Sequence, residues 1–209
     1  MKTIIFDFDG TIADSFPFVF EIVKELAPKY GYEPLKVEEI ELLRELSFQE
    51  IIKKYNIGPV KLVRMTLDAH AANARRMTET KLFSGMVETL KGLKHEGYQL
   101  AIMSSNSKKN ILSFLSINKL DMFDNVDTSI SLFGKGKKLQ RIIKKLGLKN
   151  SDVIYVGDEA RDIDAAKEAG IRIISVDWGY NKPEILKENN DIVVSSPAEL
   201  KLQIEKSFK

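Results

Sequence analysis

The sequence contains no cysteine and only two histidines among its 209 residues. Without cysteine, disulfides, thiolate metal sites and cysteine nucleophiles are excluded, and the composition agrees with a reducing cytoplasm, where we expect the protein to reside. Two histidines do not suggest an imidazole metal cluster. Any metal site in this chain is therefore expected to use oxygen ligands.

A strong net charge and a long apolar run are also absent. The formal net charge is +2, so we expect neither a nucleic-acid partner nor an anionic membrane as partner. No apolar run approaches the ~20 residues that a membrane span needs, and "TIIF" at residues 3–6 is too short for the core of a signal peptide. The hydrophobic content of 44% is sufficient for a real core.

Short apolar runs recur along the chain, and helical patterns separate most of them. The predicted strands are "TIIF" (3–6), "YQLAIM" (98–103), "VIYVG" (153–157), "IRIISV" (171–176), "DIVVSS" (191–196) and a weaker one near 124–131. Between two of them, Leu139, Ile142, Ile143 and Leu146 recur at helical spacing. This alternation predicts an α/β protein with a doubly wound, mainly parallel sheet, a Rossmann-like core.

Residues 15–80 break this alternation. They are helical by periodicity, with breaks at Gly31, Pro34, Gly58 and Pro59, and no strand pattern interrupts them. We predict a helical cap over 15–80, inserted after the first strand into a core of residues 1–14 and 81–209. The cap would stand over the carboxyl ends of the strands, where open α/β sheets bind ligands.

Polar clusters lie at the predicted strand ends and before one helix. They are "DFDGT" (7–11), "SSNS" (104–107), "GKGKK" (134–138) and "GDEARD" (157–162). Because parallel strands end at one edge of a sheet, these clusters are expected to converge into a single crevice.

The first cluster places Asp7 and Asp9 one residue apart, where two carboxylates repel each other unless a cation or a shared proton intervenes. Together with Asp158, they would suit a hard cation such as Mg²⁺. Hydroxyl, lysine and loop amide groups are suited to bind phosphoryl oxygens. Since phosphoryl transfer is catalysed mainly by positioning and charge neutralisation, the crevice points to that chemistry.

The four motifs, in this order along the whole chain, resemble those of the haloacid dehalogenase superfamily, and "GDEARDIDAAKEAGIRIISVDWGY" resembles its phosphoglycolate phosphatase-like branch most closely. The resemblance implies a helical cap after the first motif. It also implies a Mg²⁺-dependent phosphoric monoester hydrolase acting on a small phosphorylated metabolite, such as phosphoglycolate.

The resemblance also implies roles for individual acids. Asp7 would be the nucleophile that forms an aspartyl-phosphate. Asp9 would protonate the leaving alcohol and then activate water. Mg²⁺ would be held by Asp7, by the backbone carbonyl of Asp9 and by Asp158. Asp162 would be a supporting acid next to these ligands, or would bind the ion through a water molecule.

Ser104 and Lys135 would bind the transferring phosphoryl group, and Lys137 is the alternative to Lys135 because the family more often shows a lysine followed by proline. The further substrate-binding candidates are Gly10, Thr11, Ser105 and Asn106. Asn106 and Ser107 are also expected to cap the helix that begins near Lys108.

Two other functions remain open at this point. A sugar phosphomutase would use the same aspartyl-phosphate, and a non-catalytic module could retain the fold. We expect a monomer or homodimer. The basic residues Lys137, Lys138, Arg141, Lys144 and Lys145 are expected to form a solvated helix face.

Overall fold

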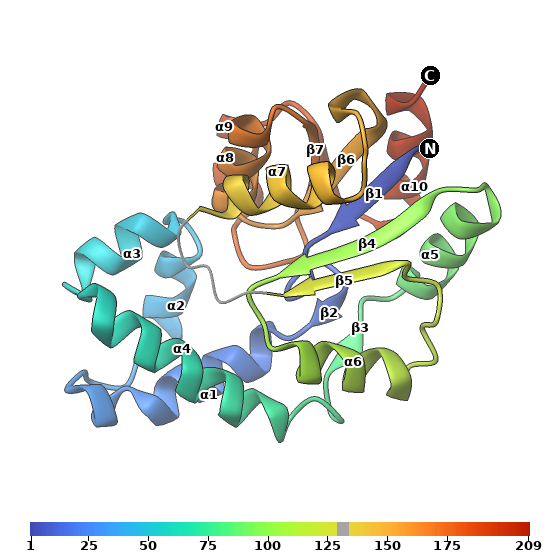
Figure 1. The fold of residues 1–209 in the computed structure, drawn as a ribbon. Helices are drawn as coiled ribbons and strands as arrows, with labels where there is room; N and C mark the ends of the chain where they lie inside the picture. The colour runs from blue at the N-terminus through green and yellow to red at the C-terminus, as the bar shows by residue number, and fades with distance from the viewer. Residues whose placement is uncertain (129–133) are drawn as a thin grey trace.

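A parallel sheet of six strands lies at the centre of the part of the chain that this computed structural model describes, residues 1–128 and 134–209 (Figure 1). Its spatial order is β5-β4-β1-β6-β7-β8. The strands are β1 (Thr3–Phe6), β4 (Gln99–Ser104), β5 (Asn125–Thr128), β6 (Val153–Gly157), β7 (Arg172–Val176) and β8 (Val193–Val194). The predicted doubly wound α/β fold is confirmed.

The strand bounds follow the apolar runs within one residue, except at β8 and β5. The run at 191–196 forms a strand of only two residues, β8. The run near 124–131 forms β5 over Asn125–Thr128, and the remainder of that prediction lies outside the described residues.

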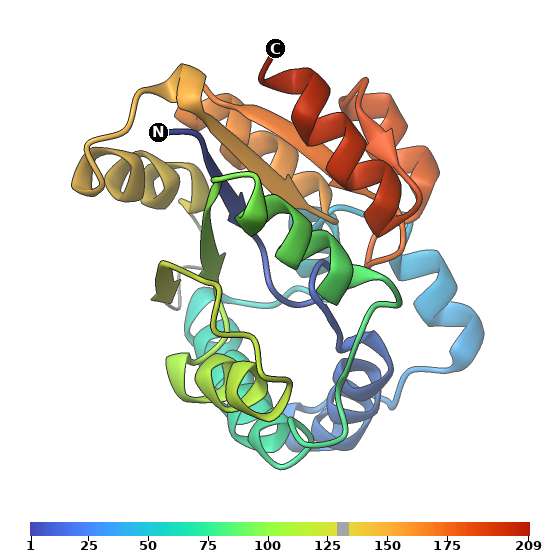
Figure 2. The same cartoon turned by 90° about the vertical axis from the view of Figure 1, so that its right-hand side faces the viewer.

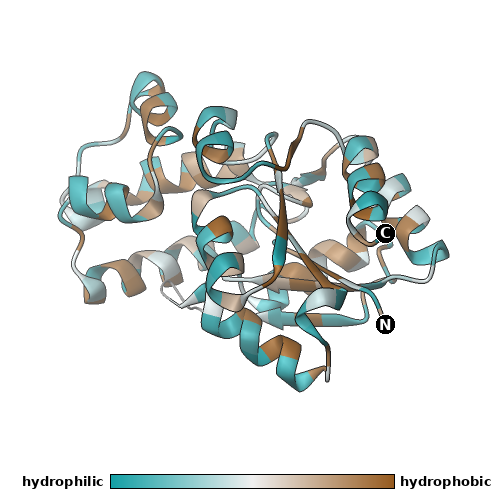
Figure 3. Ribbon diagram, turned by 90° about the horizontal axis from the view of Figure 1, so that it is seen from above, coloured by the Kyte–Doolittle hydropathy of each residue, from teal (hydrophilic) through white to brown (hydrophobic). Residues whose placement is uncertain are grey.

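Helices cover both faces of the sheet, and the alternation of side chains along the strands explains why. Ile4 and Phe6 of β1 pack on α5 (Met86–His95), α6 (Lys108–Ile117) and α10 (Pro197–Ser207). Ile5 packs on α7 (Lys135–Lys145), α8 (Ala160–Ala169) and α9 (Pro183–Asn189). Figure 3 shows brown, apolar colouring along much of the central strands, because neither face of the sheet meets water.

The helix signals in the sequence are present in the structure. The stripe on α7 buries Leu139, Ile142 and Ile143. Ser196 caps α10 by accepting the amide hydrogen of Glu199, with Pro197 at the first helical position. Ser107 caps α6 by accepting from the amide of Asn110.

The segment between β1 and β4 contains a group of helices that lies beyond the carboxyl ends of the strands (Figures 1 and 2). They are α1 (Phe16–Leu26), a short turn at Pro28–Tyr30, α2 (Val37–Leu43), α3 (Phe48–Lys54) and α4 (Pro59–Ala74). α1 packs against α4. Within the described residues, no helix combines the length and apolarity needed to cross a bilayer.

A small antiparallel pair closes this helical segment at its base. β2 (Ala13–Asp14) pairs with β3 (Lys81–Leu82). This pairing holds together the two ends of the helical segment. Strands of two residues carry too short a pattern to be recognised in the sequence. The division into a core and a cap with the bounds given above stays a prediction.

Candidate active site

The carboxyl ends of β1, β4 and β6 bring the first, second and fourth polar clusters to one place. Phe6 pairs with Ile102 of β4 and with Val156 of β6, so the residues that follow each strand emerge at the same edge. The chain continues from β1 to β4 and β5 on one side and to β6, β7 and β8 on the other. The edge beside β1 is therefore the point where the strand order reverses, the usual ligand site of such sheets.

Three acids meet at this edge. One oxygen each from Asp7, Asp158 and Asp162 lies within 4.8 Å of the other two, and all three residues are buried. The Nζ atom of Lys135 donates to Asp7 Oδ2 at 2.7 Å and also to Asp162. The Tyr155 hydroxyl also donates to Asp162 Oδ1, the oxygen that accepts from Lys135. Asp162 is thus paired within the protein, whereas Asp7 has one lysine contact and Asp158 forms no ion pair within the described part of the chain.

The electrostatic state of the cluster follows from burial and crowding. Burial raises the pKa of Asp7; Lys135 opposes the shift and Asp162 adds to it. Burial, followed by the charges of Glu159, Asp162 and Asp7, raises the pKa of Asp158 well above its ordinary value. Burial lowers the pKa of Lys135, but Asp162 and Asp7 outweigh this effect and the net shift is upward. The lysine is therefore charged, and it forms ion pairs with Asp7 and Asp162.

Asp158 is held in a fixed orientation. The Thr11 hydroxyl donates to its Oδ1 at 2.7 Å, and the Tyr180 amide donates to its Oδ2 at 2.8 Å. Gly10 makes this approach possible, because its φ is +76° and a Cβ there would collide with the Asp158 carboxylate and the Tyr180 ring. Thr11, a predicted substrate-binding candidate, therefore has its hydroxyl engaged by an acid.

Asp9 lies beside the acid cluster but in a different environment. Asn106 donates from Nδ2 to Asp9 Oδ2 at 2.9 Å, while Asp9 Oδ1 is buried without a partner in the described part of the chain. Burial raises the pKa of Asp9 to about 6, against the hydrogen bond from Asn106 and with a contribution from the charge of Asp7. A carboxyl group with this pKa exchanges a proton readily near neutral pH.

The loop after β4 supplies hydroxyl and amide groups. Ser104 is buried, and its Oγ accepts the amide hydrogen of Asn106 at 3.0 Å. Asn106 accepts in turn from the Ser107 amide and from Asn110, so the loop is braced internally. Ser105 is half-buried and lines a cavity that Asp9 also lines.

Lys138 does not belong to a solvated face, as the sequence led us to expect. It is 5% exposed and donates from Nζ to the backbone carbonyl of Ser104 at 2.9 Å, with Asp127 at 3.7 Å. Burial lowers the pKa of Lys138 to about 8. The other basic residues of this prediction, Lys137, Arg141, Lys144 and Lys145, are exposed. Lys138 tethers the Ser104 loop from behind.

We expect this buried amine to be visible in the pH dependence of stability. The pKa of Lys138 is about 8 in the folded state and 10.5 ordinarily. Between pH 8 and pH 10.5, Lys138 is therefore protonated in the unfolded chain but neutral in the folded protein. As pH rises through this range, the folded protein loses the penalty of a buried charge. The free energy of unfolding should therefore rise by up to about 3 kcal/mol. Urea denaturation of wild type and Lys138→Met should show this gain only in wild type. Lys137→Met, an exposed change on the same helix, should follow wild type; parallel curves for wild type and Lys138→Met would contradict the assignment.

The helical segment touches the core beside the acids. Asn181 donates to the carbonyls of Arg44 and Leu46, and Arg44 donates to the carbonyls of Gly179 and Tyr180 at 3.2 and 3.0 Å. These contacts join the loop after α2 to the loop after β7. The sequence analysis missed them, because backbone carbonyl acceptors leave no pattern in side-chain identity.

The pair of Glu159 and Arg161 was also missed. Arg161 donates from Nε to Glu159 Oε1 at 2.8 Å, and its guanidinium lies 4.9 Å from the ring centroid of Phe48 in α3. Both charged residues are inside the "GDEARD" motif, so their place beside the acids could have been found from the motif alone.

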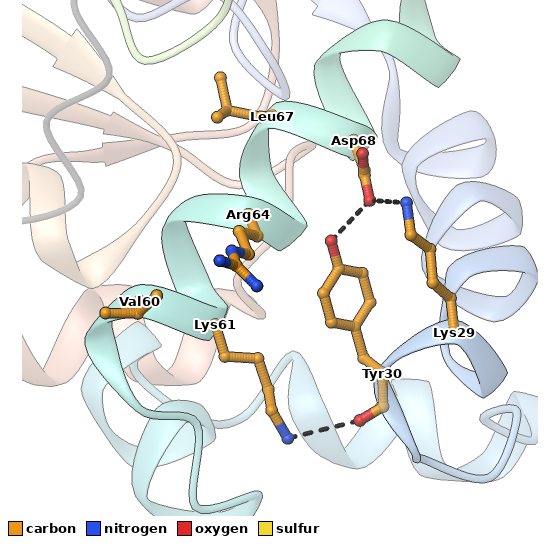
Figure 4. Close-up of a pocket in the computed structure, with 7 residues that line it drawn as sticks. All are labelled: Lys29, Tyr30, Val60, Lys61, Arg64, Leu67 and Asp68. Carbon is orange, nitrogen blue, oxygen red and sulfur yellow. Dashed lines mark hydrogen bonds and ion pairs between the residues drawn. The ribbon is translucent and has the colours of Figure 1, made fainter.

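A second hollow lies on the helical segment, and Figure 4 shows its residues. It has a volume of about 650 Å³ and is lined by Lys29, Tyr30, Val60, Lys61, Arg64, Leu67 and Asp68. Asp68 accepts from Lys29 and from the Tyr30 hydroxyl. None of the acids described above lines it, so the candidate active site is the strand-end crevice.

The arrangement of a buried acid after β1, a hydroxyl after β4, a lysine at the start of α7 and an acid after β6 agrees with a comparison of sequences. Residues 4–176 match the family model described as haloacid dehalogenase-like hydrolase. The chain belongs to this family. The haloacid dehalogenase-like match covers Asp7, Asp9, Ser104, Lys135, Asp158 and Asp162.

Individual members of the haloacid dehalogenase-like family narrow the comparison. A phosphoglycolate phosphatase of Synechococcus elongatus is 32% identical over 202 residues, which is 96% of this chain and 95% of that protein. A phosphoserine phosphatase of Methanocaldococcus jannaschii is 29% identical, covering 92% of both chains. A crystal structure described as a predicted phosphatase, from Clostridium acetobutylicum, has a TM-score of 0.85 at 24% identity and covers 98% of both chains. At this level of identity, the structural similarity supports the fold and not a specific activity.

Proposed function

We propose that the protein is a Mg²⁺-dependent phosphatase that hydrolyses a small phosphorylated metabolite through an aspartyl-phosphate on Asp7. The observation that carries this proposal is the pairing of two unlike acids at one strand end. Asp7 contacts a charged lysine, whereas Asp9 has a pKa of about 6. One acid is suited to attack and the other to transfer protons.

The acid cluster fits a magnesium ion. Mg²⁺ prefers oxygen ligands and usually takes one or two carboxylates, with water and phosphate oxygens completing an octahedron. Asp7 and Asp158 supply such carboxylates, and a divalent cation would offset the cost of burying their charges, which is the main cause of their raised pKa values. We assign the ion to Asp7, Asp158 and the carbonyl of Asp9; Asp162 is already engaged by Lys135 and Tyr155. When bound, Mg²⁺ would neutralise charge on the phosphoryl oxygens.

The residues of the chain can then account for two successive displacements. An oxygen of Asp7 bonds to phosphorus as the bond from phosphorus to the ester oxygen breaks. The leaving ester oxygen takes a proton from Asp9. Asp9, held by Asn106, then accepts a proton from water as the water bonds to phosphorus and the Asp7 oxygen is released. Lys135 and the Ser104 loop would hold the phosphoryl oxygens, and the helices of residues 15–80 would limit access of bulk water.

The names of the relatives indicate the first compounds to assay. Phosphoglycolate and phosphoserine are phosphate monoesters of small carboxylic acids, and phosphoglycolate is the reference substrate of this proposal. A cytoplasmic location and a monomeric or dimeric state stay predictions.

Metal removal tests the proposal. We expect EDTA to lower the hydrolysis of phosphoglycolate by at least ~10²-fold and added Mg²⁺ to restore it, because the acid cluster alone repels a phosphate dianion. Phosphate release is measured with phosphoglycolate and, as a second ester, with p-nitrophenyl phosphate. Circular dichroism checks that EDTA leaves the fold intact. Full activity in EDTA would contradict the metal assignment.

A further inference from the structure

A cavity of about 410 Å³ extends from the acid Asp9 into the helical segment. Its core end is lined by Asp9, Ser105 and Asn106. Beyond that end, all four helices of the segment contribute apolar side chains, among them Phe20, Val23, Leu43, Ile51, Met65 and Ala69. We refer to this space as the apolar cavity.

The volume of the apolar cavity lies in the range of ligand sites. Packed protein interiors contain few voids larger than a water molecule, whereas ligand pockets have volumes of roughly 300–1,000 Å³. Several residues of its wall in α1, α3 and α4, among them Phe20, Ile51 and Met65, are only half-buried, although others, such as Ile22 and Leu62, are buried. These helices therefore enclose space and do not fill it.

The position of Asp9 shows which part of a substrate would occupy the cavity. In the proposed reaction Asp9 protonates the ester oxygen of the leaving alcohol, and Asp9 lies on the wall of this cavity. The phosphoryl group is placed on the other side, beside Asp7 and Lys135. The carbon skeleton of the alcohol must then extend into the apolar cavity.

The two arginines of the wall are already paired within the described chain. Arg161 donates to Glu159, and Arg44 donates to the carbonyls of Gly179 and Tyr180. Burial lowers the pKa of His70, which disfavours its charged form. A charged group deep in the cavity would lose its hydration without compensation, so the wall favours an uncharged occupant.

One polar atom in the wall lacks a partner. Asn73 is 4% exposed and lines the apolar cavity, and its Oδ1 has no hydrogen-bond partner among the described residues. A buried acceptor left in this state is costly. A hydroxyl or amine on a bound molecule would satisfy it, which is a separate indication that the cavity receives a ligand.

We infer that the site hydrolyses phosphate monoesters of uncharged, largely apolar alcohols, whose carbon skeleton occupies the apolar cavity while a small ester such as phosphoglycolate would fill only its mouth. This inference rests on the proposed phosphatase function and adds a substrate class to it.

A pair of aryl esters tests the charge preference with the wild-type protein loaded with Mg²⁺. Naphthyl phosphate and carboxynaphthyl phosphate differ by one carboxylate on the leaving group. We expect kcat/KM for naphthyl phosphate to be at least roughly tenfold higher, because the cavity offers no unpaired cation. Equal values, or a preference for the carboxylate, would overturn the inference.

A pair of variants tests the location. Ala69 lines the cavity, whereas Ala71 on the same helix is exposed. Ala69→Phe should lower kcat/KM for naphthyl phosphate by at least roughly tenfold, with acetyl phosphate, whose leaving group is small, changing less than about threefold. Ala71→Phe should change neither. Acetyl phosphate turnover also reports whether each variant is folded.

The outcomes separate the two proposals. Turnover of acetyl phosphate without turnover of naphthyl phosphate, or an equal effect of Ala69→Phe on both, overturns the substrate class and leaves the phosphatase intact. No turnover of any ester in Mg²⁺ overturns the proposed function, and the substrate class fails with it.

Discussion

Replacing Asp7 by asparagine is expected to abolish turnover while the protein stays folded. The amide oxygen still accepts a hydrogen bond from Lys135, which lies 2.7 Å from Asp7 Oδ2, but it cannot form the bond to phosphorus. Since loss of a covalent nucleophile removes the whole pathway, kcat should fall by at least ~10³-fold. Phosphate release with saturating substrate and Mg²⁺ measures the effect.

The fold of Asp7→Asn should not be weakened in the absence of metal. Burial and Asp162 raise the pKa of Asp7, so ionising this group has a cost in the metal-free protein that asparagine removes. Asp164→Asn, an exposed change on α8, is the matched control and should keep wild-type activity. An Asp7→Asn protein with full activity would show that another group attacks phosphorus.

Replacing Asp9 by asparagine should separate the two half-reactions. Nitrophenolate leaves without protonation, so p-nitrophenyl phosphate can still phosphorylate Asp7, but the second step lacks its base. We expect one equivalent of nitrophenol to appear rapidly, followed by steady turnover that is lower by ~10²–10⁴-fold. With phosphoglycolate, whose leaving alkoxide needs the proton, both phases should be slow. Stopped-flow absorbance measures the burst.

The control for Asp9→Asn is Asp121→Asn, since Asp121 is exposed. This variant should show wild-type steady turnover with both esters. If Asp9→Asn lowered both steps equally with p-nitrophenyl phosphate and gave no burst, Asp9 would not be the base of the second step.

The strand ends were predictable from the sequence because two signals coincide there. An apolar run marks each buried strand, and the acid or hydroxyl that follows marks the edge where it emerges. β1 and β6 begin and end where the runs "TIIF" and "VIYVG" do. Parallel strands buried on both faces need such continuous runs, so the pattern is strong.

Contacts between residues distant in sequence were harder to predict. Nothing near Lys138 in the sequence distinguishes it from the exposed Lys137, since its burial results from how α7 packs beside β4. Similarly, Asn106 was grouped with the substrate-binding residues, yet its Nδ2 donates to Asp9. Motifs identify which residue types gather, while the hydrogen-bond partners depend on side-chain directions that only the folded chain fixes.

Mapping of the phosphorylated residue tests the central claim most directly. Asp9→Asn would be mixed with p-nitrophenyl phosphate and Mg²⁺, quenched in acid and digested, and its peptides analysed by mass spectrometry. We predict one phosphoryl group on the peptide that contains Asp7, and none in the protein that also carries Asp7→Asn. Nitrophenol release with the phosphoryl group on another residue, or with no phosphorylated peptide, would contradict the account.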